Sequence, residues 1–333
     1  MTAAAAEAPD QHVLPAPVLR TFTWFIVGAT FVYLINCYLT YWQGWPGVLP
    51  FFEAGQVSVL GFVQLVLYAA ALVLAAAFAF SSNTSRNLRA DAEVLNRISV
   101  FIIRASFWSV LLIGMVDAAI SFLRVEGLLE SVVGTDLAKQ LGRSRFRGPY
   151  VHMPLMAVGI AIACFRQKID FVWLAFLVVI AELAIVITRF IFSYEQAFMG
   201  DLVRFWYAAL FLFASAYTLY SDAHVRVDVF YANFTRRTRG GVNAMGAIFL
   251  GMIFCWTILI MGMWSKSSIL ITPLLGFEVS QSGFGMYIKY LMASFLSIFA
   301  ITMMIQFASS LLESVADYRG EPGARETSNE ITH

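Results

Sequence analysis

The segment SDAHVRVDVFYANFTRRTRGG, residues 221–241, is a densely charged stretch between two apolar runs. At helical spacing His224 and Asp228 lie on one face, so a contact between the imidazole and the carboxylate is feasible. Arg226 lies between them in sequence. Two interpretations stay open: an anchor whose basic residues hold the loop against anionic lipid heads, or a docking group with the more specific order His-x-Arg-x-Asp.

Ionisable residues also occur within or near the apolar runs, where they are costly and indicate a functional role by default. Glu182 and Arg189 are seven residues apart, on one face of a helix but too distant for direct contact along it. We expect each to pair with another helix or another subunit. Asp201 and Arg204 lie near the predicted outer interface, where charge costs less. The full set is Arg104, Asp117, Glu182, Arg189, Glu195, Asp201 and Arg204.

Histidine and cysteine positions argue against redox and metal chemistry. A haem held between helices needs histidines on facing spans, but His152 and His224 are expected at opposite interfaces. The cysteines, Cys37, Cys164 and Cys255, each lie inside an apolar run and read as small apolar side chains. Walker A, GxSxG and HExxH patterns do not occur in the sequence. The sequence therefore predicts no enzyme, cofactor, metal site or nucleic-acid partner.

The elements that carry these residues are predicted from composition. The chain has 333 residues, of which 60% are hydrophobic and 13% are charged, against about a quarter charged in soluble proteins. Apolar runs of about 18 residues or more recur along it and read as membrane spans. A transmembrane barrel would instead alternate apolar and polar residues. We expect an all-α polytopic membrane protein.

Eight spans are predicted, and proline is absent from the middle of each. The spans are Thr21–Trp42, Gln56–Phe80, Ile98–Leu123, Gly148–Phe165, Phe171–Phe192, Leu202–Ser221, Val242–Trp264 and Met286–Leu312. Carriers often bind substrate at helices interrupted by Gly or Pro in matched positions of two halves. The sequence shows no such pair, which favours uninterrupted helices and weighs against a complete substrate pathway.

The distribution of basic residues predicts the orientation, because positive residues in short loops mark the cytoplasmic side. With eight spans, the main basic regions fall on one side together with both termini: Arg20, residues 86–97, Arg166 with Lys168, and residues 224–239. Residues 124–147 are basic yet belong to the opposite side. Because apolar residues recur there about one turn apart, we expect an amphipathic helix on the outer membrane surface.

One long run resembles a known family. VITRFIFSYEQAFMGDLVRFWYAALFLFASAYTLYSDAHVRVDVFYANFTRRTRGGVN is similar to the small permease (DctQ-like) subunit of tripartite ATP-independent periplasmic (TRAP) transporters. The matching motifs are Arg189-Phe190 at a span end, Asp201-Leu202-x-Arg204-Phe205 at the next span, and His224-x-Arg226-x-Asp228 in the following loop. Asp stands where the family usually has Glu, and the proline common before the last span is missing. The resemblance covers about residues 170–316.

The resemblance implies a non-catalytic scaffold subunit. Its expected organisation is a cytoplasmic tail (1–20), a four-span extension (21–169), a four-helix core (170–316) and a second cytoplasmic tail (317–333). Its expected partners are a large permease subunit holding the substrate and sodium sites, a periplasmic substrate-binding protein, and phospholipids. Organic acid uptake by sodium symport across the bacterial inner membrane is the implied activity.

The residues implied in docking or structure are His224, Arg226, Asp228, Arg189, Asp201, Arg204 and Glu182. Two other functions stay open. The chain could be a self-contained carrier or channel with Glu182, Arg189 and Asp117 in an internal path. It could also be the membrane anchor of a respiratory or other complex, although the histidine positions disfavour a haem.

Overall fold

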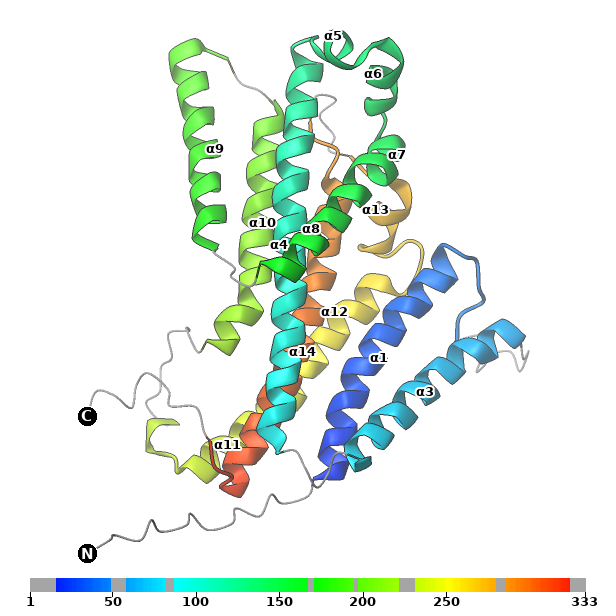
Figure 1. The fold of residues 1–333 in the computed structure, drawn as a ribbon, viewed down its shortest axis with the longest axis vertical. Coiled ribbons are helices and arrows are strands. Elements are labelled where there is room, and N and C mark those ends of the chain that lie inside the picture. The colour runs from blue at the N-terminus through cyan, green and yellow to red at the C-terminus, as the bar shows by residue number, and fades with distance from the viewer. Residues whose placement is uncertain are drawn as a thin grey trace, which may run out of the picture. The chain divides into compact units, whose positions relative to one another are not determined.

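The computed structural model describes residues 16–48, 58–81, 87–166, 171–194, 197–221, 231–279 and 285–323, all of them helical or connecting. Within these ranges eight helices are long and apolar enough to cross a membrane (Figure 1). The predicted all-α polytopic fold and the number of spans are confirmed. The cytoplasmic position of the termini and the domain limits stay predictions.

Sixteen helical elements follow one another along the described part of the chain. The elements of 11 residues or more are α1 (Pro17–Tyr41), α3 (Val59–Ser81), α4 (Leu88–Val125), α8 (Met153–Phe165), α9 (Phe171–Phe192), α10 (Ala197–Tyr220), α11 (Arg236–Gly246), α12 (Ile253–Met263) and α14 (Lys289–Arg319). α11 and α12 belong to one span, Arg236–Met263. The short elements are α5 (Leu129–Val133), α6 (Thr135–Leu141), α7 (Ser144–Arg147), η1 (Gly148–His152), η2 (Tyr231–Asn233), η3 (Ala247–Met252) and α13 (Ile271–Gly276).

The chain forms two compact units, and the long helices α4 and α14 each contribute to both. Unit 1 comprises residues 1–95, 225–251 and 307–333; unit 2 comprises residues 96–224 and 252–306. Hydrogen bonds join α4 to α14 in each unit: Ser309 donates to the Ala92 carbonyl in unit 1, and Ser99 donates to the Thr302 carbonyl in unit 2.

In unit 1, α1 packs against α3. Buried Gln64 of α3 donates to Thr40 at 3.0 Å and accepts from the Gly47 amide at 2.9 Å. This arrangement satisfies a polar side chain that would be costly if it were buried alone. The Nε of buried Arg20 contacts Asp91 at 2.6 Å, so an ion pair links α1 to the first turn of α4.

Unit 1 also contains an ion-pair group centred on α14. Asp317 lies 2.7 Å from the Arg89 guanidinium and 2.8 Å from the Arg236 guanidinium. α11 approaches α14 closely at Gly240, where an added Cβ would lie 2.5 Å from the Ser314 carbonyl oxygen. A single carboxylate of α14 therefore connects α4 and α11.

Unit 2 contains an extensive apolar core, formed by α4, α9, α10 and the first half of α14. Phe295 of α14 contacts two α10 rings, with ring centroids 5.1 Å from Phe205 and 5.0 Å from Phe213. α8 crosses α4 at Gly159, where any Cβ would lie 2.6 Å from the Ser109 amide nitrogen. The missing side chain thus permits the backbone approach that carries α8 across α4.

The fourth and seventh spans are continuous helices, Ser144–Phe165 and Arg236–Met263, and each contains a π-helical turn, η1 and η3. One expectation about continuity is wrong. Residues 124–147 form three short helices instead of one amphipathic helix, with a break at Gly134, whose φ is +82°. An L residue rarely adopts that backbone conformation, so the glycine permits the turn.

Candidate functional site

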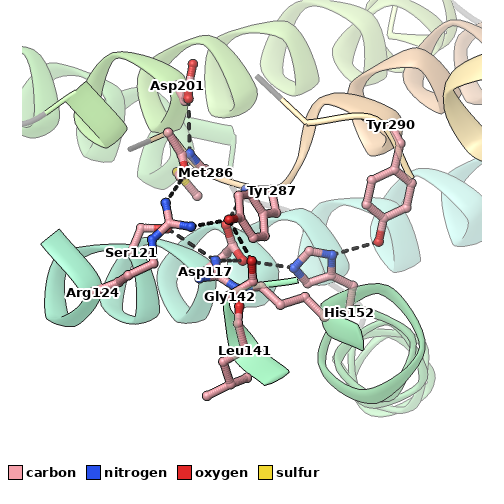
Figure 2. A network of polar contacts seen from close by, with 12 residues as sticks. Asp117, Ser121, Arg124, Leu141, Gly142, His152, Asp201, Met286, Tyr287 and Tyr290 are labelled. Carbon is pink, nitrogen blue, oxygen red and sulfur yellow. Dashed lines mark hydrogen bonds and ion pairs between the residues drawn. The ribbon is translucent and has the colours of Figure 1, made fainter. Parts of the chain in front are cut away.

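One face of the second half of α4 carries polar residues in an otherwise apolar stretch. Asp117, Ser121 and Arg124 follow one another at i, i+4 and i+7, so their side chains lie on the same side. Asp117 and Ser121 are fully buried. Figure 2 shows all three pointing into a shared network of polar contacts.

Arg147, at the end of α7, brings a second buried charge to this face. Its side chain is fully buried, and its Nη1 donates to Asp117 Oδ1 at 2.8 Å and to Ser121 at 3.3 Å. Its Nε donates to the Leu141 carbonyl at 2.5 Å. The guanidinium therefore links α4 to the end of α6.

His152 ends the π-helical turn η1 and is also fully buried. Its Nε2 lies 3.1 Å from Asp117 Oδ1, and its Nδ1 lies 2.7 Å from the hydroxyl of Tyr290 on α14. Since an ionised carboxylate only accepts hydrogen bonds, the proton belongs on Nε2 and the tyrosine hydroxyl donates to Nδ1. The imidazole thus bridges α4 and α14. Single π-helical turns are common at functional sites.

Tyr287 lies just before α14 and contacts the cluster through its backbone and its side chain. Its amide donates to Asp117 Oδ2 at 2.9 Å, and its hydroxyl donates to the Gly142 carbonyl at 2.9 Å while accepting from Arg124. The ring centroid lies 4.3 Å from Cζ of Arg147 and 4.6 Å from Cζ of Arg124. Both guanidinium groups therefore make cation–π contacts with the ring.

Asp201 of α10 completes the arrangement by accepting from the Met286 amide at 3.1 Å. Two consecutive amides, of Met286 and Tyr287, therefore donate to carboxylates of two different helices (Figure 2). Both residues precede α14, so no helical carbonyl accepts from their amides, and a backbone amide that is buried without a partner is costly. The carboxylates fix the chain where it enters α14.

The cluster is saturated around Asp117. Its two oxygens accept from Arg147, His152 and the Tyr287 amide. Removing one partner of a buried ion pair typically costs about 3–5 kcal/mol, because the other charge stays buried. The arrangement therefore suits holding segments together. Among the residues that the structure describes, no group of three or more His, Cys, Asp or Glu is placed to bind a metal.

The structure places the seven residues that the resemblance implies in docking or structure in three different settings. Asp201 is buried beside the cluster, with Arg204 Nη2 3.9 Å away on a side chain that is 71% exposed. Glu182 and Arg189 are exposed on α9 and take no part in the cluster. The remaining three, His224, Arg226 and Asp228, lie outside the described residues.

Sequence reasoning missed most of the cluster. Arg147 was expected in a surface helix, whereas its side chain is fully buried. His152 was expected near a membrane interface, and its burial within the chain was not anticipated. Tyr287 and Tyr290 were not singled out. The available signal was the spacing of Asp117, Ser121 and Arg124 on one face of an apolar helix, which indicates a partner for that face.

Comparison with known proteins gives one match. Residues 175–317 match the family model described as "Tripartite ATP-independent periplasmic transporters, DctQ component". The match includes Asp201, Tyr287 and Tyr290 but not Asp117 or Arg147. No curated protein and no solved structure matches the chain.

Proposed function

Because residues 175–317 belong to the DctQ component family of tripartite ATP-independent periplasmic transporters, we propose that the chain is the non-catalytic scaffold subunit of such a transporter. The family match carries this proposal. In it, a large permease subunit contains the route for solute, and a periplasmic binding protein delivers the ligand. Sodium-coupled uptake of an organic acid across the bacterial inner membrane is the proposed activity.

The buried cluster supports a structural role for the chain. A solute pathway needs polar groups that face a passage, whereas Asp117 is fully buried and accepts hydrogen bonds from three groups of its own chain. These contacts fix the residues that directly precede α14, and they do not line a passage for solute. This is the behaviour expected of a rigid scaffold.

The cluster also suggests what part of the extension does. Asp117, Arg147 and His152 precede the matched residues, whereas Tyr287 and Tyr290 lie within them. Their contacts build α4, α7 and η1 into the same unit as the start of α14. In this proposal these elements belong to the scaffold itself and are not an appended module.

The group His224, Arg226 and Asp228 is proposed to fix the turn after α10 or to dock on a partner. Asp201 and Arg204 are proposed as structural residues at the start of α10, consistent with the contacts of Asp201 to Met286 and Arg204. Phospholipids are the proposed neighbours of the exposed apolar faces of the helices.

Reconstitution tests the proposal. The chain, its cognate large permease and the binding protein are purified separately and together, and sodium-driven uptake into liposomes is measured. We expect uptake only when all three are present. Uptake by the chain alone would favour a self-contained carrier, and failure of the chain to co-purify with the large permease would contradict the scaffold assignment.

A further inference from the structure

α9 is the least covered of the long helices of unit 2 and has α10 as its close neighbour (Figure 1). Only Leu174, Val178 and Ala181 are buried among its described side chains. These recur every three or four residues and belong to the apolar core. The other sides of the helix carry large exposed apolar side chains along its whole length.

A second stripe runs along α9 beside the buried one. Ala175, Val179, Glu182, Val186 and Arg189 follow one another at alternating steps of four and three residues. This spacing keeps side chains on one seam of a helix that packs lengthwise against another. Val179 is 62% and Val186 48% exposed, so the described chain leaves this seam largely uncovered.

Glu182 is the unusual member of the stripe. It lies halfway along a 22-residue helix, about 16 Å from either end at 1.5 Å per residue. Its side chain is exposed and makes no hydrogen bond or ion pair within the described part of the chain. A carboxylate at this depth cannot reach the membrane surface, so contact with lipid alone is unfavourable.

We propose that this stripe is the contact surface for a membrane helix of the large permease subunit. The partner helix presents a basic or hydrogen-bond-donating side chain opposite Glu182. Small and β-branched residues at Ala175, Val179 and Val186 allow the close helix approach that membrane interfaces favour. The inference rests on the proposed function, because that function supplies a second membrane subunit.

A second copy of the chain fits the stripe poorly. Copies inserted in the same direction place Glu182 opposite Glu182, which sets two carboxylates against each other. Pairing Glu182 with Arg189 of the copy would need an axial shift of about 10 Å, since seven residues separate them. Charge complementarity therefore favours a different chain.

Photo-crosslinking with matched positions tests the surface. A photoreactive residue replaces Val186 or Val179 on the stripe, or the neighbouring Ile187 or Ile180 off the stripe, in the chain co-expressed with its cognate large permease. All four side chains are between 39% and 62% exposed. We expect crosslinks to the large permease from the stripe positions at least about fivefold above the neighbours.

Charge variants test the role of Glu182. Glu182→Lys is expected to reduce co-purification of the large permease at least about tenfold, which corresponds to 1.4 kcal/mol. Glu182→Gln keeps hydrogen-bonding capacity and is expected to reduce it less. Leu183→Lys places a charge at the same depth on another side of the helix and is the control; it should leave co-purification near wild type.

The outcomes separate this inference from the function on which it depends. If wild-type chain retains the large permease but stripe and neighbour positions crosslink equally, or Glu182→Lys binds normally, the surface is wrong and the scaffold function stands. Crosslinks from Val179 to a second copy of the chain would also overturn it. If wild type does not associate with the large permease at all, the proposed function itself fails.

Discussion

Asp117 and Glu182 are carboxylates in membrane-spanning helices of the same unit. They differ in where their hydrogen-bond donors come from. Asp117 is fully buried and accepts from two side chains and one amide of its own chain. Glu182 is exposed halfway along α9. A charge at the centre of a bilayer costs about 2.5–3.5 kcal/mol on insertion scales. The comparison separates a carboxylate whose donors all lie within the chain from one whose donor we propose to lie in another chain.

The largest expected loss of stability is at the cluster around Asp117. Asp117→Ala leaves Arg147 charged and buried, so we expect the isolated chain to lose about 3–5 kcal/mol of stability. Thermal unfolding followed by tryptophan fluorescence measures the loss. Arg147→Met combined with Asp117→Ala removes both charges and should recover part of it. A loss in the double variant equal to the sum of the losses of Asp117→Ala and Arg147→Met alone would show that the pair is not coupled.

His152→Ala should have the next largest effect. It takes a donor from Asp117 and an acceptor from Tyr290, and each buried group left unsatisfied costs about 1–3 kcal/mol. His152→Gln offers both a donor and an acceptor and should be closer to wild type in the same unfolding measurement. If glutamine were as damaging as alanine, the bridging role assigned to the imidazole would be wrong.

Tyr290→Phe tests a single hydrogen bond of the cluster. It removes the hydroxyl that donates to His152 Nδ1 and keeps the ring, which packs 5.2 Å from Phe277. We expect a loss of about 1 kcal/mol. Tyr207→Phe, at a position that is 53% exposed, is the control and should change stability by less than the error of the measurement.

The smallest effect on the isolated chain is expected at α9. Glu182→Leu removes a charge that makes no contact in the described chain, so stability should stay within about 0.5 kcal/mol of wild type. If the proposed contact surface is right, the same variant weakens association with the proposed large permease. A large loss of stability in the isolated chain would mean that Glu182 has a hydrogen-bond or ion-pair partner within its own chain. The contrast with Asp117 would then disappear.

The sequence alone supported the membrane class, the number of spans and the family, since each depends on local properties. Long apolar runs report helices that must satisfy their backbone internally, and residues 175–317 carry the family pattern. Helix limits were less accurate. α4 begins at Leu88, ten residues before the predicted span, because polar residues such as Asp91 and Arg97 continue the helix beyond the apolar run.

The candidate cluster was not predictable in the same way. Its members come from α4, α7, η1 and the start of α14, and Asp117 and Tyr287 are 170 residues apart in sequence. For Arg147 the residue type predicted an exposed side chain, because an arginine in a basic loop is usually exposed. Only the returning path through α5, α6 and α7 brings it to Asp117.

The sequence by itself determined that the chain is a set of apolar helices with a few charged residues that are costly in a membrane. Hydropathy and helical spacing depend only on residues that are close together in sequence. The tertiary structure alone decided which of those charges are satisfied within the chain. Asp117 meets donors from distant segments, whereas Glu182 lies on an uncovered seam. The physical reason is that pairing depends on packing between helices, which spacing along one helix does not specify.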